Sequence, residues 1–187
     1  RSRVGSYIGI IDITDKATPA KETITAKKVL NGKDLEADKY EFELKKGEEF
    51  VATAKNAADG TVTFKEIEFE TAGDYTYTIT EKAGSEKGVT YDTATHKVTV
   101  EVVDNGAGKL VATVTDNNPT FTNTYVASST QVTFTAKKVL NGKGKELAAG
   151  QFKFELKQGD TVVETATNAA DGTVTFKAID FATAGEH

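Results

Sequence analysis

Cysteine is absent from this chain of 187 residues, as are methionine and tryptophan, and proline and histidine each occur only twice. Without cysteine, disulfides, thiol nucleophiles and cysteine-ligated metal sites are excluded. His96 and the terminal His187 are too few for a zinc site or a Ser-His-Asp triad. We therefore expect no metal, no cofactor and no enzymatic turnover.

Long apolar runs and excess positive charge are also lacking. No apolar run reaches the roughly 18 residues of a membrane-spanning helix, and Arg1 is not followed by the apolar core of a signal peptide. The formal net charge of -5 argues against nucleic acid as a partner. We expect no membrane contact by this segment.

Short alternating runs separated by turn signals predict an all-β fold. The chain contains 16 glycines, and Asn-Gly or Asp-Gly pairs stand between apolar stretches. The predicted strands of the first half are residues 23–30, 39–45, 49–54, 61–65, 75–81, 97–103, 109–115 and 120–125. This spacing is typical of an immunoglobulin-like β-sandwich with Greek-key connections.

The sequence repeats itself at the length of one such sandwich. Residues 25–33 recur identically at 135–143, and residues 56–65 recur at 168–177. We predict a leader or vector-derived segment at 1–20, a complete repeat at 21–127 and a truncated repeat at 128–187. The junction at 126–130 is very short, which favours a stiff stalk.

The truncated repeat ends where the first continues beyond Asp74. With strands predicted near 132–140, 151–157 and 173–177, it would expose strand edges and an apolar face. We expect it to be unstable, disordered or completed by another molecule. In the predicted leader segment at 1–20, Ile8, Ile10 and Asp12 would share one face of a strand, and this strand could replace the missing one.

Three polar residues occupy positions where the predicted strands should be apolar. Side chains alternate between faces, so Lys28 shares a face with Ile24, Glu81 ends the apolar face of 75–81, and Asn123 follows Phe121 on the same face. Burying an amine, a carboxyl and a carboxamide unpaired would be strongly unfavourable. Chemistry among the three is the sharpest explanation.

The three groups can form an amide bond. Burial favours the neutral amine of Lys28 and the protonated acid of Glu81. The amine could attack the side-chain carbonyl of Asn123 while Glu81 polarises that carbonyl and passes protons to departing ammonia. Alternatively, Lys28 could extend to solvent, Glu81 could be a solvated turn residue, Asn123 could be an edge residue bonded to backbone, and a β-bulge would exchange Lys28 for Lys27.

The motifs AKKVLNGK, NAADGTVTF, TAGDYTYTITE, GVTYD and FTNTY resemble the isopeptide-forming domains of Gram-positive pilins and adhesins, the FctA-like and Cna-B-like repeats. The resemblance implies a Lys28–Asn123 isopeptide bond with Glu81 as its catalyst. It also implies an extracellular place on a cell-wall-anchored protein, with neighbouring repeats or pilin subunits as partners. LPxTG-like and YPK-like motifs are not present in the chain.

We therefore expect a structural stalk or shaft segment stabilised by one autocatalytic crosslink. The alternative is an adhesin domain that recognises a host matrix protein or glycan, although near-identical repeats favour a spacer, with any host ligand bound through other domains. In the truncated repeat, Lys138 occupies the place of Lys28 without Glu or Asn partners. We expect Lys138 to remain an unreacted amine, with Asp12 as a remote alternative acyl partner.

Overall fold

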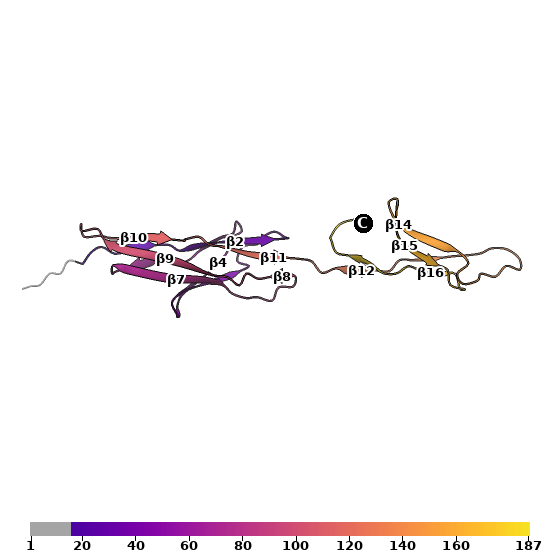
Figure 1. Ribbon diagram of the computed structural model, residues 1–187, viewed down its shortest axis with the longest axis horizontal. Helices are drawn as coiled ribbons and strands as arrows, with labels where there is room; N and C mark the ends of the chain where they lie inside the picture. The colour runs from indigo at the N-terminus through magenta and orange to yellow at the C-terminus, as the bar shows by residue number, and fades with distance from the viewer. Residues whose placement is uncertain (1–15) are drawn as a thin grey trace, which may run out of the picture. The chain divides into compact units, whose positions relative to one another are not determined.

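The computed structural model describes residues 16–187, so the predictions for Ile8, Ile10 and Asp12 lie outside the described residues. Every regular element in this range is a β-strand, which confirms the all-β class. Within the same range, no helix is long and apolar enough to cross a membrane. The chain divides into two compact units, one ending at Tyr125 and the other spanning Val126–His187 (Figure 1).

The first unit is an immunoglobulin-like sandwich of two sheets, with a short extra pair of strands. One sheet has the order β10-β9-β7-β3-β4, formed by Leu110–Thr115, Thr95–Asp104, Gly73–Glu81, Glu41–Lys46 and Glu49–Lys55. The other has the order β5-β2-β11-β8, formed by Thr61–Thr63, Thr25–Asn31, Thr120–Tyr125 and Val89–Thr90. The extra pair is β1 (Ala20–Glu22) with β6 (Ile67–Phe69).

Each strand predicted for this unit overlaps an observed one, with ends that differ by a few residues. The sequence did not predict β1, β6 and β8. These strands are only two or three residues long. An alternating pattern needs about four residues before it can be recognised.

Alternation of side chains builds the core between the two sheets. On β9, Val98, Val100 and Val102 are buried, and the residues that precede each of them, Lys97, Thr99 and Glu101, are not. The inward faces of the two sheets meet in one cluster, whose fully buried members include Ile24, Ala26, Phe42, Leu44, Val62, Ile79 and Phe121. The same parity that buries Ile24 and Ala26 also buries Lys28.

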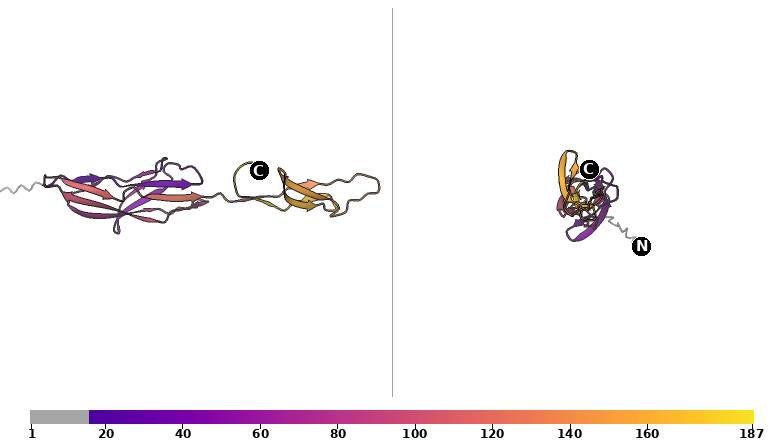
Figure 2. Two further views of the ribbon diagram at one scale, coloured as in Figure 1. Left: turned by 45° about the horizontal axis from the view of Figure 1, so that its top comes forward. Right: turned by 90° about the vertical axis from the view of Figure 1, so that its right-hand side faces the viewer.

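The strands β2 and β11 pair in parallel, whereas the other strand pairs of the two main sheets are antiparallel. Phe121 lies opposite Lys28, and Asn123 lies opposite Leu30. The two strands lie side by side and point the same way (Figure 2). The first long strand of the unit is therefore a direct neighbour of its last strand.

A glycine turn holds the backbone of Lys28 in place. Gly60 has a φ of 88°, a conformation that favours glycine, and its carbonyl accepts a hydrogen bond of 2.7 Å from the Lys28 N–H. A Cβ added at Gly60 would lie 2.2 Å from the carbonyl oxygen of Lys28. The Asp59-Gly60 turn can therefore approach β2 only because residue 60 has no side chain.

We expect Gly60→Ala to lower the free energy of unfolding well beyond the roughly 1–2 kcal/mol that a left-handed non-glycine residue costs. Gly47→Ala is the matched control, because Gly47 has a φ of 61° but no atom within 4 Å of an added Cβ. Urea denaturation of both variants separates the clash from the conformational strain. Equal losses in the two variants would show that the close approach to Lys28 has no energetic weight.

The second unit contains three two-stranded sheets. These are β12 (Thr130–Val132) with β17 (Ile179–Phe181), β13 (Thr135–Lys137) with β16 (Thr173–Thr175), and β14 (Lys153–Gln158) with β15 (Thr161–Thr167). The strands β15 and β17 were not among the predicted ones. Val174 and Phe176 are buried, but Phe134 is 39% exposed, so much of the apolar surface of this unit is uncovered.

Candidate crosslinking site

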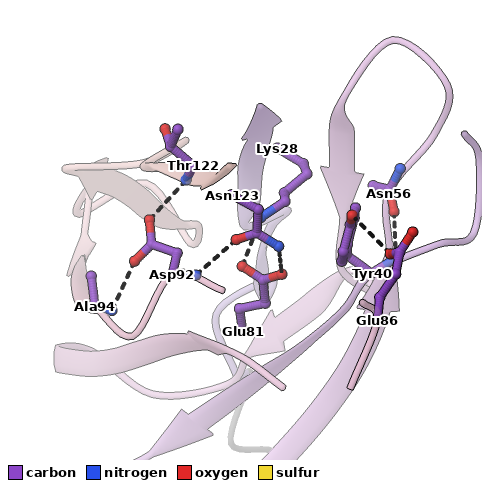
Figure 3. A network of polar contacts seen from close by, with 9 residues as sticks. All are labelled: Lys28, Tyr40, Asn56, Glu81, Glu86, Asp92, Ala94, Thr122 and Asn123. Carbon is purple, nitrogen blue, oxygen red and sulfur yellow. Dashed lines mark hydrogen bonds and ion pairs between the residues drawn. The ribbon is translucent and has the colours of Figure 1, made fainter. Parts of the chain in front are cut away.

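Lys28, Glu81 and Asn123 come together in the core of the first unit. Lys28 on β2 and Asn123 on β11 belong to one sheet, and Glu81 reaches them from the end of β7 in the other sheet. The Lys28 Nζ donates a hydrogen bond of 2.7 Å to Glu81 Oε2, and the Asn123 Nδ2 donates one of 2.6 Å to Glu81 Oε1 (Figure 3). One carboxylate thus bridges an amine and an amide nitrogen.

The three groups are shielded from water. Lys28 is 1% exposed, Asn123 is 0% exposed and Glu81 is 9% exposed. Aromatic rings complete the wall, since the Lys28 Nζ lies 4.7 Å from the ring centroid of Tyr40 and 5.9 Å from that of Phe42. Among the described residues, every buried side-chain nitrogen or oxygen has a hydrogen-bond partner. The buried polar groups of the site therefore make their hydrogen bonds within the protein.

Lys27, the neighbour that a bulge would have exchanged for Lys28, lies on the opposite face of β2. Its Nζ donates a hydrogen bond of 2.6 Å to the carbonyl oxygen of Asp59 at the exposed turn. The strand β2 runs in unbroken register with both β5 and β11. Regular alternation therefore directs Lys28, not Lys27, to the core.

Burial lowers the pKa of the Lys28 amine below its usual value of 10.5. The hydrogen bond and charge of Glu81 and the charge of Asp92 act in the opposite direction, but they offset the burial only in part. A lowered pKa makes the neutral amine, which is the nucleophilic form, easier to reach.

The carbonyl of Asn123 faces a different partner from the one that we expected. We expected Glu81 to polarise this carbonyl, but both oxygens of Glu81 face nitrogen atoms. The main-chain N–H of Asp92 instead donates a hydrogen bond of 2.7 Å to Asn123 Oδ1. Asp92 was not among the predicted site residues, and its only signal in the sequence is its place at the end of the GVTYD motif.

A second polar cluster holds the Tyr40 ring over the amine. Glu86 accepts hydrogen bonds from Lys33 and, at 3.3 Å, from the Tyr40 hydroxyl, and its carboxylate lies 3.7 Å from the Lys39 Nζ (Figure 3). Tyr91 packs edge-on against Tyr40 with centroids 5.8 Å apart. Burial, followed by the charge and hydrogen bond of Glu86, raises the pKa of Tyr40 to about 12. The Tyr40 hydroxyl therefore stays protonated at neutral pH, and an uncharged ring packs against the Lys28 amine.

Asn56, a buried asparagine in the repeated NAADGTVTF motif, was also not among the predicted site residues. Asn56 Oδ1 accepts a hydrogen bond of 2.8 Å from the Tyr40 N–H, and its Nδ2 donates to the carbonyls of Glu36 and Ala57. Asn168 makes the equivalent bond of 2.8 Å to the Phe152 N–H in the second unit. Asn56 therefore fastens the loop that carries Tyr40. Its recurrence in the repeat was the available signal.

Lys138 of the second unit lies in different surroundings from Lys28. Its Nζ is 4.4 Å from the ring centroid of Phe152, which takes the place of Tyr40. Within the part of the chain that the structure describes, the one ion pair of this unit joins Lys157 to Glu155 and does not include Lys138. The lysine and its aromatic neighbour recur, but the carboxylate does not.

Comparison with protein families matches residues 24–126 to the FctA family, described as the Spy0128-like isopeptide containing domain. The chain belongs to this family. The match covers more than half of the chain and confirms the resemblance inferred from the motifs. A search of curated proteins found no match.

Solved pilins are similar to the chain over most of its length, at low identity. The major pilin of Streptococcus pyogenes is 19% identical over 90% of this chain and 74% of the pilin, with a TM-score of 0.39. The T-13 major pilin of the same species is 17% identical over 89% of this chain and 83% of that chain, with a TM-score of 0.41. The TIE protein of Bacillus anthracis is 14% identical over 86% of this chain and 26% of that protein, with a TM-score of 0.33. The family assignment rests on the match of residues 24–126.

Proposed function

We propose that residues 21–127 form a load-bearing segment of a Gram-positive surface protein, in a pilus shaft or an adhesin stalk. In this proposal an autocatalytic isopeptide bond between Lys28 and Asn123 locks the segment, and Glu81 is the catalyst. The observation that carries the proposal is the Glu81 carboxylate, which contacts the amine at 2.7 Å and the amide nitrogen at 2.6 Å in a site closed to water.

The reaction needs only the groups that are present. A proton passes from the Lys28 ammonium to Glu81 and leaves a neutral amine next to the carboxyl group that also holds the Asn123 amide. The Nζ–Cγ bond forms, the Cγ–Nδ2 bond breaks, and Glu81 gives its proton to the departing nitrogen and takes one from the attacking nitrogen. The products are one secondary amide and one ammonia. Positioning in the folded core replaces a bimolecular encounter and can supply a large part of the rate.

The proposal also explains why the reaction occurs once per molecule. The amine and the amide are both consumed, so the domain is its own substrate and no turnover follows. Water cannot compete as the nucleophile, because the aromatic rings and the two sheets exclude it from Lys28 and Asn123.

The bond would lie where pulling force enters the unit. Lys28 and Asn123 are on the adjacent parallel strands β2 and β11, near the two ends of the unit along the chain. A covalent link between these strands carries tension directly from one to the other. In a chain without cysteine, it provides the covalent stabilisation that disulfides give other extracellular proteins.

We expect the intact mass of the folded protein to fall below the sequence mass by one ammonia. Proteolysis followed by tandem mass spectrometry should find Lys28 and Asn123 in one branched peptide, with Lys138 unmodified. Lys28→Met should restore the full mass, because methionine has a similar length but no amine. Finding the full sequence mass in folded wild-type protein would rule out the proposed bond.

A further inference from the structure

We propose that the main-chain N–H of Asp92 stabilises the oxyanion of the Lys28–Asn123 reaction and that the Asp92 side chain positions this N–H. This inference rests on the proposed crosslinking. It assigns to the loop between β8 and β9 a part of the chemistry that the three core side chains cannot supply.

The contact is made at the reacting group itself. The Asp92 N–H donates a hydrogen bond of 2.7 Å to Asn123 Oδ1, on the opposite side of the amide from Glu81 (Figure 3). When the amine attacks Cγ, negative charge develops on Oδ1, and the N–H already points at this atom. A donor placed in advance at such an oxygen in a dry site is among the most effective means of stabilising a transition state.

The same N–H selects which way the amide faces. The two ends of a carboxamide are alike in shape, but a main-chain N–H can only donate, so the oxygen must face it. The Nδ2 then faces Glu81, where the leaving nitrogen can receive a proton. In the flipped amide, Nδ2 would meet a second donor and the leaving group would point away from the acid. Asp92 therefore holds Asn123 in its reactive orientation.

The Asp92 side chain ties this loop to β11. Its Oδ2 accepts a hydrogen bond of 2.7 Å from the N–H of Thr122, which directly precedes Asn123, and its Oδ1 accepts one of 2.8 Å from the Ala94 N–H. The carboxylate and the main-chain N–H of Asp92 thus form hydrogen bonds with two adjacent residues of β11, Thr122 and Asn123. This closed arrangement fixes the distance from the N–H to Oδ1.

The carboxylate is ionised in this position. Burial alone would raise the pKa of Asp92, but the hydrogen bonds from the N–H groups of Ala94 and Thr122, together with electrostatic interactions with Lys28 and His96, bring this pKa below its usual value of 3.8. An ionised carboxylate accepts both hydrogen bonds at neutral pH. At neutral pH the Asp92 carboxylate can therefore hold its main-chain N–H against Asn123 Oδ1.

With Asp92 included, every bond and proton in the reaction is accounted for by Lys28, Glu81, Asp92 and Asn123. The amine of Lys28 attacks, the Asp92 N–H holds the charge on Oδ1 as the Nζ–Cγ bond forms, and Glu81 protonates Nδ2 as the Cγ–Nδ2 bond breaks. The charge on Oδ1 then returns to the carbonyl, ammonia leaves, and the attacking nitrogen gives its extra proton to Glu81. No group outside the chain is needed.

The first test measures the rate of bond formation. Wild-type protein and Asp92→Ala are made in a short cell-free pulse, quenched in acid at intervals, and weighed for the loss of ammonia. Asp92→Ala keeps the main-chain N–H but removes the carboxylate that holds it against Asn123 Oδ1. We expect crosslinking to slow by up to roughly a hundredfold, the loss expected when one oxyanion donor no longer acts. Asp104→Ala is the matched control, since Asp104 Oδ1 accepts a similar bond of 2.8 Å from the Gly106 N–H in a turn outside the site.

A second variant separates the chemistry from folding. An ester in place of the Tyr91–Asp92 peptide bond removes the N–H but keeps the carboxylate and its two hydrogen bonds. It should slow the reaction by a similar factor in a folded protein. In the Lys28→Met background, which cannot react, both variants should shift the ¹³C resonance of Asn123 Cγ upfield, because the hydrogen bond to Oδ1 is weakened or lost, whereas Asp104→Ala should leave this resonance unchanged.

The outcomes separate this inference from the proposal beneath it. Slow crosslinking together with the carbonyl shift supports the role of Asp92. Wild-type crosslinking with an undiminished rate in the folded ester variant overturns that role and leaves the Lys28–Asn123 bond standing. A wild-type protein that never loses ammonia overturns both.

Discussion

Pulled from the two ends of its first unit, the wild-type chain is expected not to lengthen between Lys28 and Asn123, whereas Asn123→Ala should extend fully. The bond would remove about 95 residues from the extensible length, and at roughly 3.3–3.6 Å per residue this is a difference of roughly 300 Å. Single-molecule force spectroscopy, with handles attached near residues 20 and 126, measures this length directly.

Asn56→Ala provides the matched control for this experiment. Asn56 is also a fully buried asparagine, and it makes hydrogen bonds to Tyr40, Glu36 and Ala57, so its loss should weaken the fold. Because Asn56 does not belong to the reacting set, the variant should crosslink and should resist extension as the wild type does. Full-length extension of the wild type at a force similar to that of Asn123→Ala would contradict a covalent link.

The parity of strand residues predicts that Lys28, Glu81 and Asn123 face the core, and the structure buries all three. A strand has one alternation period and one buried face, so polar residues in phase with Ile24, Ile79 and Phe121 are directed inward. Which strands become neighbours could not be read from parity. The parallel pairing of β2 with β11, and the arrival of Glu81 from the other sheet, depend on contacts between residues far apart in the sequence.

The roles of the loop residues could not be predicted for a different reason. Asp92 acts through its main-chain N–H, which every residue except proline possesses, and Glu86 acts from a segment without periodicity. The orientation of the Asn123 amide follows from the Asp92 contact, so the sequence alone could not indicate that Nδ2, and not Oδ1, faces Glu81. The roles of Asp92 and Glu86 and the orientation of the Asn123 amide all depend on the geometry of loops, which residue types alone do not specify.

The two repeats show how far identical sequence determines structure. Lys27 donates to the carbonyl of Asp59, and Lys137 likewise donates to that of Asp171. A Cβ added at Gly172 would lie 2.2 Å from the carbonyl oxygen of Lys138, just as one added at Gly60 would lie 2.2 Å from that of Lys28. The pairing of β13 with β16 therefore repeats the pairing of β2 with β5. The carboxylate that would meet Lys138 does not recur, because Glu81 lies beyond the repeated segment.

Glu81→Gln is expected to give a folded protein with the full sequence mass. Glutamine has the shape of glutamate and can still accept a hydrogen bond from Lys28, but it cannot carry a proton from the attacking to the leaving nitrogen. Glu81→Ala should also lack the bond and should be less stable than Glu81→Gln. Removing one partner of a buried ion pair typically costs about 3–5 kcal/mol.

The loss of the bond itself should be visible in the free energy of unfolding. A crosslink that closes a loop of about 100 residues is worth about 4.7 kcal/mol by the chain-entropy argument used for disulfides. Guanidinium denaturation and intact mass, measured on the same samples of wild type, Glu81→Gln and Asn123→Ala, test this. Both variants should show a loss of that size, since neither can form the link.

Glu43→Gln is the control for the change of charge. Glu43 lies on β3 next to β7, and its carboxylate contacts Lys45 at 3.0 Å near the surface, away from the reacting groups. This variant should crosslink fully and lose little stability, because exposed ion pairs contribute about 0–1 kcal/mol. Complete crosslinking in Glu81→Gln would show that proton transfer does not pass through residue 81, and the catalytic role would then have to be assigned to another group.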